Sequence, residues 1–128
     1  RIMLSGADLA PDPVAPGELL QVTFYWQALR EMDVPYTVFV HLLGPDGRVV
    51  AGHDGEPLNG SRPTTGWVPG EYIADLHELP VPAGLATGDY VVEVGLYDAG
   101  VLAMPRLPIL GEEGQAKTDR VIFPVRVR

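Results

Sequence analysis

The sequence predicts an all-β protein, built as a two-sheet antiparallel β-sandwich of about seven or eight strands. Apolar and polar residues alternate with a period of two over four segments, which is typical of strands with one face packed inward. The 15 glycines and 13 prolines fall largely between the apolar runs, where an all-β chain needs its turns. No segment of ten or more residues shows a helical period. A barrel is the second architecture that this pattern allows.

The clearest strand covers residues 20–28. Its apolar residues share one face and its polar residues share the other, so we expect the apolar face to pack inward. Trp26 belongs to that face and is expected in the core, where a tryptophan buries about 150–250 Å². The apolar positions are Leu20, Val22, Phe24, Trp26 and Ala28.

Further strands follow the same rule along the chain. Three segments alternate as regularly as the first, and three others show a weaker pattern. The regular segments are residues 36–42, 90–96 and 121–127, and the weaker ones are residues 2–9, 48–53 and 71–81.

Two turns support this arrangement of strands. The segment Gly44–Gly47 reads GPDG between two strand patterns and predicts a hairpin. Leu85, Gly88 and Tyr90 have the spacing of the tyrosine corner, in which a tyrosine hydroxyl bonds back to the backbone. This feature indicates an immunoglobulin-like or fibronectin-III-like sandwich. The polar segment 111–118 is expected to be a loop before the last strand.

Length, charge and hydropathy narrow the classes of function. A chain of 128 residues favours one domain, residues 1–128. The net charge of −8 argues against binding to nucleic acid or to an anionic membrane surface. No apolar run approaches the roughly 20 residues of a membrane helix, so we expect no direct membrane insertion. The chain begins with Arg1 rather than methionine, which predicts that it is a fragment of a larger protein.

Metal ligands and cofactor motifs are sparse. Cysteine is absent, which excludes disulfides, thiolate metal sites and cysteine nucleophiles. His41, His53 and His77 fall on three different predicted strands, without the close spacing that is common in zinc sites. We therefore expect no metal and no cofactor.

The sequence also predicts that the chain is not an enzyme, with no catalytic residues. Neither of its two serines lies in a Gly-x-Ser-x-Gly elbow. Glycosidase chemistry needs two carboxyl groups about 5–10 Å apart across a groove, and no pair here predicts one convincingly. The pairs that are close in sequence are Asp54 with Glu56, Asp75 with Glu78, and Glu112 with Glu113.

The candidate binding segment is the long connection between the predicted strands at 48–53 and 71–81. Trp67 could lie under the face of a sugar ring, with polar groups of the same connection on the sugar hydroxyls. In the other interpretation Trp67 folds back and closes the open end of the sandwich, because loops of this length need an anchor. The candidate ligand-binding residues are Trp67, Asn59, Arg62, Asp54 and Tyr72.

A family resemblance covers nearly the whole chain. The chain resembles the C-terminal β-sandwich domain of bacterial multi-pass membrane proteins of the glycosyltransferase or mannosyltransferase-like class. The motifs that carry this resemblance are moderately specific as a set. In order they are PVAPGE (13–18), VTFYWQ (22–27), YTVFVHL (36–42), GPDGRVV (44–50), HDG (53–55), PTTGW (63–67), PGE (69–71), GDY (88–90), VGLYD (94–98) and DRV (119–121).

The resemblance implies a non-catalytic accessory domain on the extracytoplasmic side of the cell membrane. The catalytic machinery of such transferases belongs to their membrane portion, so no catalytic residue carries over to this chain. The partner would be a glycan, bound directly or positioned as acceptor, or the membrane portion of the parent protein. The alternative is a structural or protein–protein interaction domain that binds no ligand. For that alternative the candidates are Thr23, Tyr25 and Gln27, on the polar face of their strand.

Overall fold

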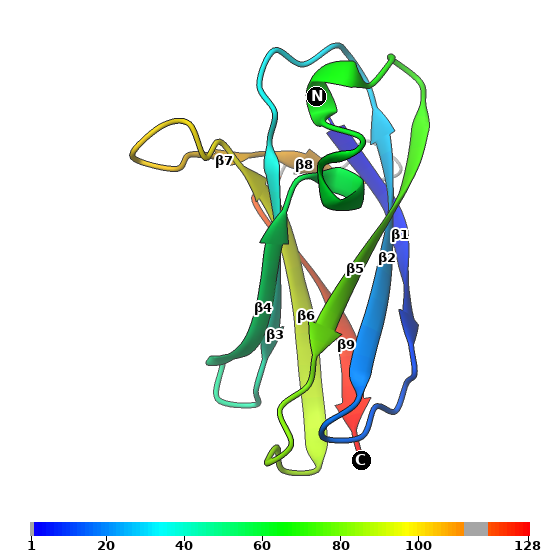
Figure 1. Ribbon diagram of the computed structural model, residues 1–128, viewed down its shortest axis with the longest axis vertical. Coiled ribbons are helices and arrows are strands. Elements are labelled where there is room, and N and C mark those ends of the chain that lie inside the picture. The colour runs from blue at the N-terminus through cyan, green and yellow to red at the C-terminus, as the bar shows by residue number, and fades with distance from the viewer. Residues whose placement is uncertain (1, 112–117) are drawn as a thin grey trace.

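The computed structural model describes residues 2–111 and 118–128, and these residues form two packed β-sheets (Figure 1). The described strands are β1 (Ile2–Ala10), β2 (Leu19–Ala28), β3 (Thr37–Leu43), β4 (Val49–Gly55), β5 (Tyr72–Pro80), β6 (Gly88–Tyr97), β7 (Arg106–Leu107), β8 (Ile109–Leu110) and β9 (Val121–Val127). Two 3₁₀ turns, η1 (Pro57–Gly60) and η2 (Thr64–Gly66), lie between β4 and β5.

The two sheets confirm the predicted sandwich. The four strands of sheet A follow the order β5-β2-β1-β8, and sheet B contains β4-β3-β6-β7 with β9 paired to β6. The long pairings within both sheets are antiparallel. Each strand predicted from alternation is present, with ends that shift by one or two residues.

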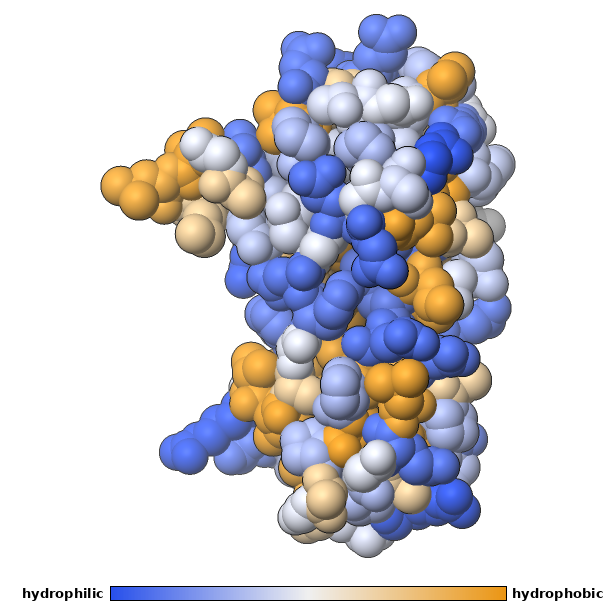
Figure 2. Space-filling view, in the orientation of Figure 1, coloured by the Kyte–Doolittle hydropathy of each residue, from blue (hydrophilic) through white to orange (hydrophobic). Residues whose placement is uncertain are grey.

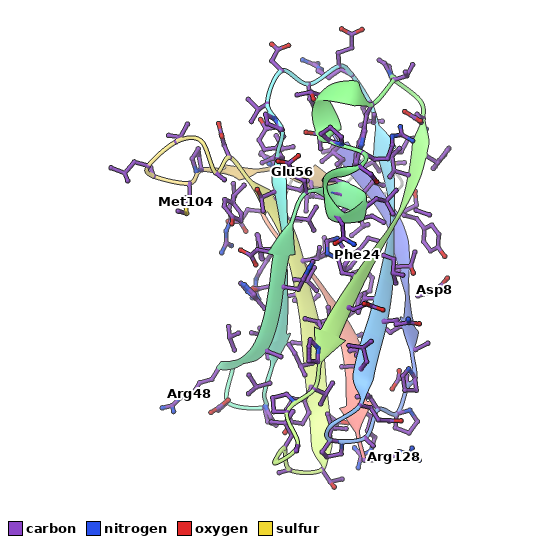
Figure 3. The ribbon with its side chains drawn as sticks, viewed as in Figure 1. Asp8, Phe24, Arg48, Glu56, Met104 and Arg128 are labelled. Carbon is purple, nitrogen blue, oxygen red and sulfur yellow. The ribbon has the colours of Figure 1, made fainter. Side chains whose placement is uncertain are left out.

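The core lies between the inner faces of the sheets. Figure 3 places Phe24 in this interior layer, and Trp26 beside it on β2 is fully buried, as its position in the alternation predicts. The two rings lie 6.0 Å apart between centroids. Burying such aromatic side chains supplies much of the apolar contact that stabilises a sandwich.

Both predicted turns are present. Gly47 occupies the left-handed region at φ +80° and closes the β3–β4 hairpin, with its N–H donating to the carbonyl of Gly44 at 2.9 Å. The hydroxyl of Tyr90 donates to the carbonyl of Ala86 at 2.8 Å, which is the bond expected of a tyrosine corner.

The edge strands β7 and β8 differ from the prediction. The chain leaves sheet B after Leu107, which pairs with β6, and joins sheet A at Ile109, which pairs with β1 in parallel. Alternation does not predict strands of two residues, because their pairing is decided by the partners they meet across space. The sandwich is therefore mixed at one edge rather than wholly antiparallel.

No helix among residues 2–111 and 118–128 is long and apolar enough to cross a membrane. The loop expected at residues 111–118 falls mostly outside the residues that the structure describes.

Candidate functional site

The connection from β4 to β5 is a packed crossover, and Trp67 anchors it. The indole is 2% exposed, and its Nε1 donates to the carbonyl of Arg62 at 2.9 Å. Thr64 secures the same turn, because its hydroxyl donates to the carbonyl of Val34 at 2.6 Å and accepts from the N–H of Tyr36 at 3.0 Å. Of the two interpretations of Trp67, its burial agrees with the one in which it closes the open end of the sandwich, and the buried ring offers no face to a sugar.

The other residues predicted for this site have different surroundings. The N–H of Val68 donates to Glu71, and this bond, together with the ion pair that Arg62 forms with Glu71 at 2.6 Å, lowers the pKa of Glu71. Tyr72 is 64% exposed on sheet A. Asn59 borders a hollow between the edges of the two sheets.

Asp54 lines a different concave site from the hollow beside Asn59. It lies on β4, on the outer face of sheet B, rather than in a loop. We call this site the outer hollow, a depression of about 180 Å³. Its lining residues are Phe39, His41, Asp54, Tyr97, Met104 and Arg106.

The surrounding surface makes this face concave. Figure 2 shows the left side of the molecule hollowed between two projections. Figure 3 labels Met104 on the upper projection, which is the loop between β6 and β7, and Arg48 on the lower one, at the β3–β4 hairpin. A second depression, of about 560 Å³ and bordered by Leu43 and Arg120, lies on sheet B as well. Sheet B thus presents a recess larger than the outer hollow alone.

Gly95 explains how an aromatic ring lies flat on this face. Phe39 and Gly95 pair across β3 and β6, and a side-chain carbon on Gly95 would overlap the Phe39 ring. The same carbon would lie 2.8 Å from the carbonyl oxygen of Asp119. A glycine inside a strand often marks such a close approach. Its absent side chain leaves the space that the ring occupies.

A carboxylate and a tyrosine form the polar wall of the outer hollow. The hydroxyl of Tyr97 donates to Oδ2 of Asp54 at 2.9 Å. Burial, together with this bond to a carboxylate, raises the pKa of Tyr97 above its usual value. The other carboxylate oxygen, Oδ1, lies 3.8 Å from Nε2 of His41. Asp54 is 44% exposed in its side chain and so keeps acceptor capacity for a ligand hydroxyl.

A charged network adjoins the outer hollow through His41. Oε1 of Glu93 lies 2.9 Å from Nδ1 of His41, and its Oε2 accepts from Arg120 at 2.8 Å. Burial raises the pKa of Glu93, but the bonds to His41 and Arg120 together outweigh it and lower the pKa overall. The guanidinium of Arg106 lies 4.6 Å from the Phe39 ring centroid, a cation–π contact. Ligand hydroxyl groups would therefore meet both donors and acceptors.

A second polar cluster lies inside the sandwich. Asp75 is fully buried on β5, and its Oδ2 accepts from Nε1 of Trp26 at 3.2 Å and from Nε2 of His77 at 2.6 Å. Its Oδ1 accepts from the N–H of Leu58 at 2.8 Å. Leu58 has φ +52°, a strained position for a leucine, and this conformation directs its N–H to the carboxylate. Nδ1 of His77 lies 3.0 Å from Nδ1 of His53.

Sequence reasoning missed most of both clusters. A glycine within the β6 pattern and the outward position of Phe39 are the signals that could have pointed to the outer hollow. Asp75 lies on the same face of its strand as Ile73 and Leu79, so the sequence pattern could have predicted that it points inward. Trp26 and Leu58 were not recognisable as its partners, because they come from β2 and η1, far from Asp75 in the sequence. The remaining candidate pair, Glu112 with Glu113, lies outside the described residues.

Comparison with known proteins supports the fold. No protein-family model matches the chain, and no curated protein matches it. The CARDB domain of the PF1109 protein from Pyrococcus furiosus, crystallised with di-metal ions, is 16% identical with a TM-score of 0.53, and the match covers 100% of this chain and 88% of that one. The C-terminal domain of wzt is 15% identical with a TM-score of 0.60, and the match covers 100% of this chain and 77% of that one. At these identities the likeness establishes a β-sandwich fold alone.

Proposed function

We propose that this chain is a non-catalytic accessory domain that binds glycan through the outer hollow of sheet B. The single observation that carries this proposal is the exposed Asp54 carboxylate beside Tyr97, above the Phe39 ring, within one concave face. Sugars are recognised by such a combination, because carboxylates accept from their hydroxyl groups while aromatic surface packs on their C–H faces.

The size of the site sets the size of the ligand. A hollow of about 180 Å³ is smaller than the roughly 300–1,000 Å³ of pockets that enclose drug-sized molecules. It suits one sugar unit, with neighbouring units of a chain lying along the recess toward Arg120. The exposed carboxylate of Asp54 favours a neutral sugar over an acidic one, because it would repel an anionic ligand.

The test is a titration of isotope-labelled protein with a panel of neutral and acidic oligosaccharides, followed through backbone amide shifts. We expect saturable shifts at residues 39–41, 52–54 and 95–97 with a neutral glycan. Asp54→Asn, which keeps the shape and removes the charge, should weaken binding about 10-fold or more, in line with the loss of a charged hydrogen bond. Tyr72→Ala is the matched control, because Tyr72 is an exposed aromatic on the other sheet.

Two results would contradict the proposal. Shifts that cluster around Tyr72 or Asn59, and that disappear in Tyr72→Ala, would move the binding face to sheet A and its edge. An absence of shifts with every sugar of the panel would remove glycan binding altogether.

The setting of the domain is part of the same proposal. We infer that it is appended to a membrane glycosyltransferase-like protein, on the extracytoplasmic side, where it would hold the acceptor glycan for the membrane portion. Support comes from the motif resemblance and from the neighbours, which are themselves domains of larger proteins by their descriptions. Catalysis would belong to the parent, and the buried carboxylate of Asp75 is committed to internal hydrogen bonds.

A second candidate function is protein–protein interaction, and the β6–β7 loop favours it. Leu102 is 98% exposed at the tip, with Met104 55% and Val101 45% exposed beside it. Exposed apolar residues that gather in one projection are typical of contact sites. Sedimentation velocity at rising concentration, on the wild type and on Leu102→Ser, would test self-association. A dimer that is lost in the variant, together with no glycan binding, would favour this function over the first.

A further inference from the structure

One pair of histidines connects the two sheets at the side of the sandwich where edge strands β4 and β5 face each other. His53 lies on β4, an edge strand of sheet B, and His77 lies on β5, an edge strand of sheet A. Their Nδ1 atoms are 3.0 Å apart and their ring planes are inclined by 68°. His77 is 2% exposed, whereas His53 is partly exposed and borders a hollow of about 440 Å³. The contact is therefore reachable from solvent through His53.

Asp75 determines which ring nitrogen of His77 carries the proton. A carboxylate accepts hydrogen bonds only, so Nε2 of His77 carries the proton and donates to Oδ2 at 2.6 Å. In a neutral His77, Nδ1 then carries no proton, and its lone pair is directed at His53. In the neutral pair the bridging proton belongs to Nδ1 of His53. Nδ1 of His77 is therefore ready to bind a metal, and Nδ1 of His53 can bind one once its proton has moved to the other ring nitrogen.

We propose that His53 and His77 form a binding site for a divalent transition metal of the zinc class, held between the two Nδ1 atoms. Histidine ligands of metals almost always donate their other ring N–H to a carboxylate or carbonyl, and His77 already does so to Asp75. This inference is independent of glycan binding, because the site lies between the sheets and the outer hollow lies on the other face of sheet B.

Metal binding requires both rings to move. Two nitrogens bound to tetrahedral zinc at 2.0–2.1 Å stand about 3.3 Å apart, about 0.3 Å more than in the present contact, and the rings must also turn so that both Nδ1 lone pairs point at the metal instead of along the line between the nitrogens. The neutral His53 ring would transfer its proton from Nδ1 to Nε2 through water, with no net loss of a proton. Among the described residues no group of three or more His, Asp or Glu converges on one point. The remaining positions would therefore be taken by water from the hollow beside His53.

Zinc titration of the 128-residue chain tests the proposal. We expect calorimetry to show one equivalent bound, and the ring nitrogen spectra of His53 and His77 to change together while those of His41 stay constant. His53→Ala should abolish the binding heat and the rise in thermal midpoint that zinc produces. His41→Ala is the matched control, because His41 is the remaining histidine and also lies near two carboxylates. It should bind zinc as the wild type does.

The imidazole spectra need no substitution, so they decide the question even if His53→Ala folds poorly. His53→Gln offers a second variant of closer size. Three results would overturn the proposal: no zinc binding by the wild type, equal binding by His53→Ala, or loss of binding in His41→Ala. Cobalt(II) provides a further readout, since the wild type should give the strong visible absorption of a four-coordinate site and His53→Ala should not.

Discussion

The indole Nε1 of Trp26 donates to Oδ2 of Asp75 at 3.2 Å, so a fully buried carboxylate lies hydrogen-bonded between the two sheets. A buried charge is tolerated only where its partners satisfy it. Asp75 receives three such bonds, from Trp26, His77 and the N–H of Leu58. Within the described residues no buried side-chain nitrogen or oxygen lacks a partner.

Asp75→Ala should therefore destabilise the fold strongly. The substitution leaves three buried donors without an acceptor, and breaking a buried network of this kind costs about 3–5 kcal/mol of unfolding free energy. Urea unfolding measures the change. The control is Asp8→Ala, because Asp8 accepts from Tyr25 on the exposed face of sheet A and should cost no more than about 1 kcal/mol. Equal losses in the two variants would contradict the interior role of Asp75.

Substitutions of Trp67 should change the stability of the fold and leave glycan binding unchanged. Trp67→Ala should lower the unfolding free energy by about 3–5 kcal/mol, because it empties a buried site and removes the bond to the carbonyl of Arg62. Trp67→Phe keeps most of the packing and should cost less. In chemical-shift titrations Trp67→Phe should bind glycan as the wild type does, since the indole reaches no surface. Loss of glycan binding by a folded Trp67→Phe would contradict this assignment.

Gly95→Ala should disrupt the outer hollow specifically. The new methyl group overlaps the Phe39 ring, which must leave its place on sheet B, and overpacking of this kind costs about 1–3 kcal/mol. The loss of the ring should abolish glycan shifts while the fold persists. Gly66→Ala is the control, because a carbon added there meets nothing within 4 Å. A Gly95→Ala protein with unchanged stability and unchanged Phe39 resonances would count against the close packing described for this face.

Acid should weaken the fold partly through Glu93. Its pKa in the folded protein is lowered, because the bonds to His41 and Arg120 outweigh the opposing effect of burial. A lowered folded pKa means that the carboxylate stabilises the fold above the unfolded pKa, and that this contribution is lost as the pH falls through the folded pKa. The difference in unfolding free energy between wild type and Glu93→Gln should therefore shrink between pH 6 and pH 3. Urea unfolding at both pH values measures it, and a constant difference would argue against the shift.

The sandwich was largely predictable, because the sequence signals that specify its strands and turns involve residues close together in the chain. Alternation marks which residues of β2, β3, β6 and β9 face inward, and turn residues mark where strands stop. In the same alternation His41 and Phe39 lie opposite Val38 and Val40, and in the structure both line the outer hollow of sheet B. The sequence left the role of the long connection open between a binding loop and a segment that closes the core, and the burial of Trp67 agrees with the second.

The sequence by itself determined the fold class, the inward position of Trp26 and the tyrosine corner of Tyr90, since each depends on neighbours within a few residues. The tertiary structure alone decided that Trp67 is buried, that Asp54 meets Tyr97, and that His53 meets His77. These pairs are 43 and 24 residues apart in the chain. Which strands lie side by side, and which sheet edges meet, is set by packing of the whole chain, so no spacing along the sequence could have revealed them.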